Sequence, residues 1–473
     1  MPSAIQGDLL RRRFAEAGQE HVFAGERALG QGERERLYAA LGTIDLGLVA
    51  EFQRLIRAQP AAGATSGQAT RFDPVEVFPL RRGPAEIAEE RLARARGAEM
   101  LRSGRVGWLL VAGGQASRLG YDAPKGCFPV TPLTGTSLYE LFARKLHAAR
   151  ARHGTAAPWY VMTSEATDAP TKEYFERERY FGLDPQDVVF FRQAMVPALD
   201  PSGRILMAAP DAPFLAPNGH GGLLAALATS GALAHAAERG VEAFSYFQVD
   251  NPLAVPADPL FLGLHATRAA RMSSKVVRKR DAAEKVGVLG KVDGTLTCIE
   301  YSDLPAPLRD ARDERGELLY WAGNIALHVL DRAYVEDLTR GGLRLPWHVA
   351  RKRIPTIAAD GSRAEVEGFK FETFVFDALS LAGPSVVLEV AREQEFSPVK
   401  NKDGEDSARS ADRDQCRLFA SWAARAGVAL PPPDVDGVQR VEIDPRFAED
   451  EAEFRARLPA TPREVGGGHL YAP

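Results

Sequence analysis

Cysteine is scarce in this chain, which carries only Cys127, Cys298 and Cys416 among 473 residues. Because these three are far apart and odd in number, they argue against a disulfide framework and show no metal-ligand spacing. The chain also lacks an apolar run of 18 residues, and its amphipathic N-terminus has no apolar signal core. These absences predict a cytoplasmic protein without a membrane span.

Positive charge is not in excess either, since the formal net charge is −4. No basic field therefore favours a nucleic-acid partner. The composition, 45% hydrophobic and 26% charged, is typical of a globular protein, and the length suits two or three domains. We expect small-molecule partners and a monomer or weak homodimer.

The spacing of apolar residues changes along the chain. Residues 1–58 have helical periodicity, and 59–70 form a linker without an apolar period. From residue 106 apolar strands alternate with helices, which predicts an α/β domain with a mixed, mostly parallel sheet flanked by helices. The predicted helices include 83–104, 221–240 and 331–340. We expect an N-terminal helical region at 1–82, the main domain at 83–384 and a small α+β domain at 385–473.

The stretch VAGGQASRLG, residues 111–120, ends the first of these strands in a glycine pair. Backbone N–H groups at Ala112, Gly113 and Gly114 can approach a ligand closely there, because no Cβ intervenes. Arg118 and Lys125 can supply charge for a polyphosphate. An ordinary strand-to-helix turn is the alternative, but the ordered set with P-K-G behind it is more specific. The spacing matches neither a Walker loop nor the dinucleotide fingerprint, which argues against a Rossmann-type oxidoreductase.

The string VAGGQASRLGYDAPKG resembles the signature of the UDP-sugar pyrophosphorylases, and more narrowly the eukaryotic-type UDP-N-acetylglucosamine pyrophosphorylases and their bacterial relatives. Their motif reads L-A-G-G-Q-G-T-R-L-G followed by P-K-G, and Ala116 and Ser117 replace its Gly-Thr pair here. The resemblance covers roughly residues 83–425 through seven motifs in the family's order. It implies a Rossmann-like, GT-A-like nucleotidyltransferase fold for the main domain.

Two further motifs carry residues for the base and the sugar. In FFRQAMVPALD, Gln193 matches the family's uracil-reading glutamine, although a solvated loop glutamine is the alternative. In PNGHGGLLAAL, Gly219 matches the nucleotide-binding turn. His220 replaces the asparagine of the family's G-N-G-G, and the glucose-type relatives carry G-H-G here. This replacement leaves the acceptor sugar open.

A metal site is implied at the strand FSYFQVDN, residues 244–251, which ends in the family's V-D-N. An aspartate at the end of such a strand is a usual Mg²⁺ ligand in nucleotidyl transfer. The resemblance therefore assigns Mg²⁺ to Asp250, while a simple turn is the alternative for a bare Asp-Asn pair.

The remaining motifs concern the sugar and the phosphates. The resemblance implies that Glu300, with Tyr301 beside it, and Asn324, next to Gly323, hold the sugar. Lys370 in GFKFETFVF and Lys400 in EFSPVKNKDG match two phosphate-binding lysines, the second within the C-terminal domain. Phe374 and Phe376 suit either a pocket for the sugar's 2-substituent or the protein core.

The reaction implied by the resemblance joins UTP and a sugar 1-phosphate into a UDP-sugar and pyrophosphate, with N-acetylglucosamine 1-phosphate as the favoured acceptor. One alternative is the same reaction with glucose or galactose 1-phosphate, which His220 favours. Another is a nucleotide-sugar-binding protein without catalysis, in which Asp250 or the lysines would be expected to be lost.

Overall fold

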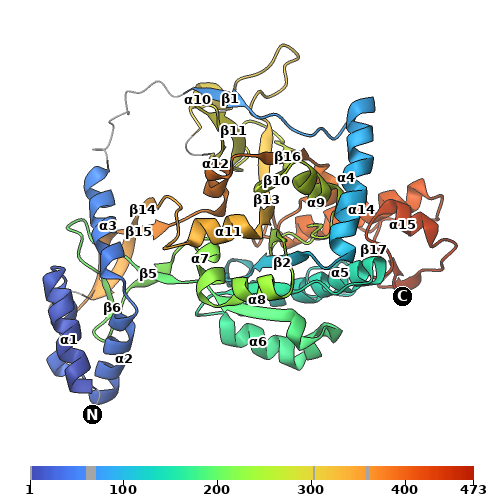
Figure 1. Cartoon of the computed structure of the whole chain (residues 1–473). Coiled ribbons are helices and arrows are strands. Elements are labelled where there is room, and N and C mark those ends of the chain that lie inside the picture. The colour runs from blue at the N-terminus through green and yellow to red at the C-terminus, as the bar shows by residue number, and fades with distance from the viewer. Residues whose placement is uncertain (1–2, 60–70, 302–303, 358–361) are drawn as a thin grey trace. The chain divides into compact units, whose positions relative to one another are not determined.

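The computed structural model of the chain describes residues 3–59, 71–301, 304–357 and 362–473 (Figure 1). It consists of two compact units, each built from segments that are far apart in sequence. Unit 1 comprises residues 1–69, 193–223 and 344–375, and unit 2 comprises 70–192, 224–343 and 376–473. The three-part division expected from the sequence stays a prediction. Within the described residues, every helix is too short or too polar to cross a membrane.

Unit 2 contains a ten-stranded mixed sheet. Its parallel part runs in the order β9 (Ala243–Gln248), β2 (Val106–Val111), β3 (Trp159–Thr163) and β4 (Val188–Arg192). These strands are mostly buried apolar runs, as expected for parallel strands covered on both faces. The mixed, mostly parallel sheet of the predicted fold class is therefore confirmed.

The rest of the sheet extends from β9. β13 (Ala322–Asp331) runs antiparallel to β9, and β10 (Met272–Arg278) pairs with β13 and with β16. The outer strands are β1 (Phe72–Pro74), β11 (Val288–Val292), β12 (Thr295–Ile299) and β16 (Ser385–Glu389).

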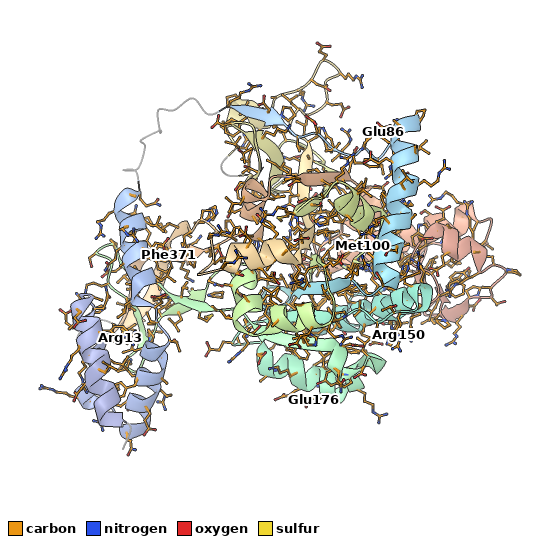
Figure 2. The ribbon with its side chains drawn as sticks, viewed as in Figure 1. Arg13, Glu86, Met100, Arg150, Glu176 and Phe371 are labelled. Atoms are coloured by element: carbon orange, nitrogen blue, oxygen red, sulfur yellow. The ribbon has the colours of Figure 1, made fainter. Side chains whose placement is uncertain are left out.

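Helices that alternate with the strands flank this sheet in unit 2 (Figure 1). The longer ones are α4 (Pro84–Arg102), α5 (Leu138–His153), α6 (Asp168–Arg177), α8 (Ala232–Glu238), α9 (Pro259–Thr267), α11 (Arg332–Thr339) and α14 (Ala408–Arg425). The expected helices at 83–104 and 331–340 correspond to α4 and α11. Figure 2 labels Met100, a buried residue of the apolar core, on α4.

Two glycines let α4 and α9 pack closely. A Cβ on Gly97 would lie 1.9 Å from the carbonyl oxygen of Pro259, and one on Gly263 would lie 1.7 Å from that of Ala93. Any side chain at either position would therefore push the helix backbones apart.

The predicted helix 221–240 is wrong in one respect, because the structure has two helices there. α7 (Gly222–Thr229) ends before Gly231, and α8 begins after it. Gly231 adopts φ +84°, a left-handed conformation that breaks the helical path and that glycine adopts readily.

The last part of unit 2 packs around a small apolar cluster that includes Trp422, Val441 and Phe454. Its elements are α15 (Glu451–Ala456) and the three-stranded sheet of β17 (Val441–Ile443), β18 (Arg463–Val465) and β19 (Gly468–Tyr471). Short helices elsewhere in unit 2 are α10 (Ala306–Arg309), α12 (Leu379–Ala382) and α13 (Arg392–Glu395).

Unit 1 packs three N-terminal helices against a hairpin. The helices are α1 (Ser3–Glu16), α2 (Gln31–Gly42) and α3 (Leu46–Ala58), and the hairpin is β14 (His348–Ile357) with β15 (Arg363–Glu372). Phe371 of β15, labelled in Figure 2, stacks on Phe52 of α3 with ring centroids 3.8 Å apart. The short strands β5 (Met195–Pro197), β6 (Met207–Ala209), β7 (Ala212–Pro213) and β8 (Leu215–Pro217) complete this unit.

Candidate active site

The glycine loop lies at the carboxyl end of β2, as the sequence predicts. Ala112 is still tied to the sheet, since its N–H donates to the carbonyl of Met162 in β3. The chain then turns back on itself, and the N–H of Lys125 donates to the carbonyl of Gly114 over 3.0 Å. The loop therefore returns Lys125 to the strand end that carries Gly113 and Gly114.

Gly114 has no structural requirement for glycine within the described residues. A Cβ built there would meet no heavy atom within 4 Å, and its φ lies outside the left-handed region. Gly126, in the same loop, differs, because a Cβ there would lie 2.1 Å from the ring of Tyr139. Packing explains Gly126, whereas the space over Gly114 suits the close approach of a ligand.

Asp250 faces Lys125 at this strand end. Its carboxylate Oδ2 lies 3.5 Å from Nζ of Lys125, and the side chains are 14% and 16% exposed. The contact follows from the sheet, because β2 and β9 pair in parallel with Val111 opposite Gln248. Continued by two residues, that register puts Gly113 beside Asp250.

Lys400 belongs to the same part of unit 2. The N–H of Val399 donates to the carbonyl of Asp250 over 2.8 Å, so the backbone next to Lys400 is fixed to Asp250. The Lys400 side chain is exposed, and its Nζ lies 5.9 Å from the ring centroid of Phe396.

Arg118 lies on the exposed helical turn Ser117–Leu119 that follows the glycine pair. Among the described residues, no carboxylate lies within ion-pair distance of its guanidinium. An exposed cation without a counter-ion next to the loop is suited to bind an anion from solution.

The predicted sugar residues of unit 2 lie on β13 and directly after β12. Asn324 is fixed by its own backbone and side chain, since its N–H donates to Gly287 and its Oδ1 accepts from Ala326. β13 and β9 are antiparallel with His328 opposite Tyr246, so the start of β13 and the end of β9 share one edge of the sheet. Gly323 and Asn324 therefore lie at the edge that carries Asp250. Glu300 is partly exposed and Tyr301 is 44% exposed.

Unit 1 holds Gln193 and Gly219 together. The amide Nε2 of Gln193 donates to the carbonyl of Gly219 over 2.6 Å. Gly219 has φ +80°, and a Cβ there would lie 2.3 Å from the carbonyl oxygen of Thr373. Backbone conformation and packing therefore account for this glycine, and one N–H of Gln193 is already used within the protein.

His220 is oriented by its neighbours in unit 1. Its Nδ1 accepts a hydrogen bond from the N–H of Val375 over 3.1 Å, and its ring stacks on Phe374 with centroids 5.2 Å apart. Burial, followed by the nearby His348, lowers the pKa of His220 to about 4. The ring is therefore neutral at pH 7, and its proton is on Nε2.

Lys370, also in unit 1, lies on β15. Its Nζ is 5.1 Å from the ring centroid of Phe214. Phe376, weighed in the sequence as a pocket residue, is buried in unit 2.

The donors present fit a metal ion that brings most of its own ligands. No group of three or more His, Cys, Asp or Glu side chains able to hold a metal occurs in the described part of the chain. Asp250 offers a carboxylate 3.5 Å from Lys125 of the loop. Mg²⁺ commonly binds through one or two carboxylates plus water and substrate phosphates, so a single aspartate fits it.

Three residues support this site although the sequence assigns them no role in it. Asn251 binds the segment before Lys400 through both ends of its amide. Lys275, which is buried, and Lys145, which is partly buried, hold the loop after Asp250. For Lys275, the sequence offers only its place beside apolar residues in SSKVVRKR. The same string is equally typical of a solvated basic strand.

Comparisons with known proteins agree with this arrangement. Residues 72–423 match the family model described as UTP–glucose-1-phosphate uridylyltransferase. The chain is 37% identical over 438 residues to UDP-N-acetylhexosamine pyrophosphorylase-like protein 1 of Homo sapiens, which covers 88% of this chain and 85% of that protein. It is 31% identical over 476 residues to UDP-N-acetylglucosamine pyrophosphorylase of Saccharomyces cerevisiae, covering 95% and 97%.

Solved structures agree as well. The uridine diphosphate N-acetylglucosamine pyrophosphorylase of Trypanosoma brucei, in complex with an inhibitor, has a TM-score of 0.81 at 26% identity and covers 99% of this chain and 98% of that one. The family match spans well over half of the chain. The chain therefore belongs to the UTP–glucose-1-phosphate uridylyltransferase family of nucleotidyltransferases.

Proposed function

We propose that this chain transfers a uridylyl group from UTP to N-acetylglucosamine 1-phosphate and releases pyrophosphate. The name of the yeast relative supports this acceptor, and the name of the human relative supports an N-acetylhexosamine more generally. The single observation that carries the proposal is the contact of Lys125 with Asp250 beside the open space over Gly114. A cation, a metal-binding carboxylate and a backbone without a side chain are what a nucleoside triphosphate needs at one place.

The chemistry needs no nucleophile from the protein. An oxygen of the sugar phosphate forms a bond to the α-phosphorus of UTP, the bond to the bridging oxygen breaks, and the electron pair leaves with pyrophosphate. The attacking oxygen is already anionic, so no general base is required. The protein contributes position and charge neutralisation, as in other phosphoryl-type transfers.

The glycine loop would bind the nucleotide. We assign contact with the uridine to the backbone of Ala112, Gly113 and Gly114. Arg118 and Lys125 neutralise the departing pyrophosphate. Both cations lie on the same loop, and Arg118 is exposed to solvent without a counter-ion among the described residues.

Asp250 would hold Mg²⁺, which supplies Lewis-acid stabilisation of charge on the α-phosphate when it is bound. Lys400 neutralises phosphate charge next to it. Support comes from the hydrogen bond between Val399 and Asp250, which keeps the two functional residues on adjoining backbone.

The acceptor sugar would contact Glu300, Tyr301 and Asn324, with Gly323 allowing close approach. The residues of unit 1 keep the roles that the family motifs imply. Gln193 and Gly219 contact the uracil, His220 contacts the sugar and Lys370 contacts phosphate.

Glucose or galactose 1-phosphate is the second candidate acceptor, and His220 is the observation that favours it. A neutral imidazole whose Nδ1 accepts from Val375 carries its proton on Nε2, which can only donate. An asparagine at this position both donates and accepts. A group that only donates can bind the oxygen of a hydroxyl but cannot accept from the N–H of an acetamido group, so it favours a sugar without that group.

The test is pyrophosphate release from UTP and Mg²⁺ with N-acetylglucosamine, N-acetylgalactosamine, glucose or galactose 1-phosphate. We expect release with N-acetylglucosamine 1-phosphate and its loss in Asp250→Ala. Asp436→Ala, a surface aspartate paired with Arg409, is the matched control and should stay active. Pyrophosphate release only with glucose 1-phosphate would make glucose 1-phosphate the acceptor in place of N-acetylglucosamine 1-phosphate. No pyrophosphate release with any of the four sugar phosphates would favour a nucleotide-sugar-binding protein without catalysis.

The oligomeric state and the location are proposed as the sequence predicts them, a monomer or weak homodimer in the cytoplasm. Light scattering after size exclusion tests the first, and fractionation of cells tests the second.

A further inference from the structure

Lys275 is a fully buried cation in the interior of unit 2. It lies on β10, its side chain is 1% exposed, and its Nζ is 2.7 Å from Oδ2 of Asp258 and 2.7 Å from Oε2 of Glu395. Burial alone would lower the pKa of Lys275, but the two carboxylates outweigh it and raise the pKa above its ordinary value. The ammonium therefore stays charged and bridges two separate segments.

Asp258 belongs to the first of these segments, the loop 250–258 that leads from Asp250 to α9. Its other oxygen accepts from the N–H of Leu260 and caps that helix. Along the same loop, Nζ of Lys145 donates to the carbonyls of Pro252 and Ala254 over 2.7 and 2.6 Å. The buried ammonium group of Lys275 and the partly buried one of Lys145 thus fix the loop that begins with Asp250.

Glu395 belongs to the second segment, 395–400, which ends with Lys400. The carbonyl of Glu395 accepts from Nδ2 of Asn251 over 2.7 Å, and Oδ1 of Asn251 accepts from the N–H of Ser397. Together with the hydrogen bond from Val399 to Asp250, these contacts join the two segments along their length. Lys275, on β10 of the sheet, adds an ion pair to each of the two segments.

A buried ion triad is a costly way to fill space. Charges lose their hydration on burial, and replacing such groups by apolar side chains of similar volume is often neutral or stabilising. What apolar side chains cannot do is hold two particular carboxylates, on two segments, at fixed distances. The triad therefore fits a requirement for position better than one for stability.

We propose that Lys275 is a positioning residue, which holds Asp258 and Glu395 together and thereby sets where Lys400 lies relative to Asp250. It acts on turnover without touching the substrates. This inference rests on the proposed function, because it takes Asp250 and Lys400 as groups of the active site.

The test removes the three charges together, since Lys275→Met alone would leave two carboxylates buried without a cation. In the variant Lys275→Met/Asp258→Asn/Glu395→Gln, no charge is left unpaired and the amides keep similar shapes. We expect kcat to fall about 10-fold to 100-fold, the size of effect that a small misplacement has. KM for UTP should stay within about threefold, because the glycine loop is untouched.

A double-mutant cycle with Lys400→Ala separates positioning from a general loss of structure. If Lys275 acts through Lys400, the triple substitution should lower kcat little further once Lys400 is alanine. An equal loss in both backgrounds, or a rise in KM for UTP without a fall in kcat, would overturn the inference.

Glu395→Gln alone is the second variant. It tests the proposal in the case that the triple variant does not fold. It leaves Lys275 paired with Asp258, and we expect a smaller loss of kcat that again disappears with Lys400→Ala; an unchanged kcat would overturn the inference. Asp444→Asn is the matched control, a buried carboxylate of the same unit paired with Arg144 and Arg446. Its kcat should stay close to that of the unsubstituted chain.

The unsubstituted chain separates the two hypotheses. If it releases no pyrophosphate with any sugar 1-phosphate, the proposed function fails. If it is active and the Lys275 variants are equally active, the proposed function stands and only the positioning role is wrong.

Discussion

Nζ of Lys125 lies 3.5 Å from the carboxylate of Asp250, where the substrate phosphates would bind. Lys125 is brought there by the loop that follows β2, and Asp250 lies two residues after the neighbouring strand β9. Replacing Lys125 by methionine keeps much of its length but removes its charge. We expect kcat to fall about 10²-fold to 10³-fold, as for other single charged contacts to a transition state. Steady-state rates of pyrophosphate release measure this. Lys291→Met, which removes an exposed lysine paired with Glu76, is the control, and equal rates for the two variants would contradict the assignment.

Gly114→Ala tests whether the space over the loop belongs to a ligand. The added Cβ meets no protein atom within 4 Å, so we expect the free energy of unfolding to stay within about 1 kcal/mol. KM for UTP should rise at least about tenfold if the nucleotide lies against this backbone. Gly42→Ala on α2 is equally unhindered and should leave KM for UTP unchanged, while the free energy of unfolding rises by up to about 1 kcal/mol because alanine favours the helix. Unchanged UTP kinetics in Gly114→Ala would show that the nucleotide binds elsewhere.

Gly263→Ala should loosen the contact of α9 with α4. Its Cβ would lie 1.7 Å from a backbone oxygen of α4, which no side-chain rotation can relieve. We expect a loss of about 1–3 kcal/mol in the free energy of unfolding, or more if the helices cannot separate. Urea denaturation gives the value. Gly32→Ala, in the first turn of α2, meets no atom closer than 3.9 Å and serves as the comparison; equal stability of both variants would argue against the close helix contact.

His265 should make the protein sensitive to mild acid. It is buried on α9, its Nδ1 lies 2.8 Å from the hydroxyl oxygen of Ser273, and burial lowers its pKa from 6.5 to about 4. Because the folded pKa lies below the unfolded value, its stabilising effect is complete above pH 6.5 and is lost as the pH falls towards 4. Between pH above 6.5 and pH below 4, this one group lowers the free energy of unfolding by about 3 kcal/mol.

The measurement for His265 is urea denaturation at several pH values between 7 and 4, with His265→Gln as the partner variant. Glutamine can still bind Ser273 but does not titrate, so its stability should fall less than that of the unsubstituted chain. Parallel curves for the two proteins would show that His265 does not titrate in this range.

Much of the fold could be predicted from local patterns. β2 and β9 are apolar runs that end in Gly-Gly and Asp-Asn, and those endings also indicate where ligands bind in a parallel sheet. The contact of Lys125 with Asp250 could not be predicted from spacing, because it depends on β2 and β9 being neighbours. That strand order is a property of the whole sheet.

Other features depend on backbone conformation or on burial, which the amino-acid sequence does not show directly. A single helix was expected across Gly231, where one residue in the left-handed region produces two helices. Gly219 and Gly114 look alike in the sequence, yet contact with Thr373 accounts for one and no protein contact accounts for the other. Lys275 looks like a solvated strand residue, since only the folded chain brings its two carboxylates together.

The stacking of Phe52 on Phe371 has a consequence for synthesis of the chain. The N-terminal helices leave the ribosome before the hairpin that packs on their apolar faces, and all strands of the unit 2 sheet except β16 are made between them. Until then, α1–α3 must wait with apolar surface uncovered, a state that favours aggregation and slows folding. A product cut short before residue 344 would keep that surface exposed permanently, which makes translation to the end of β15 the step that completes unit 1.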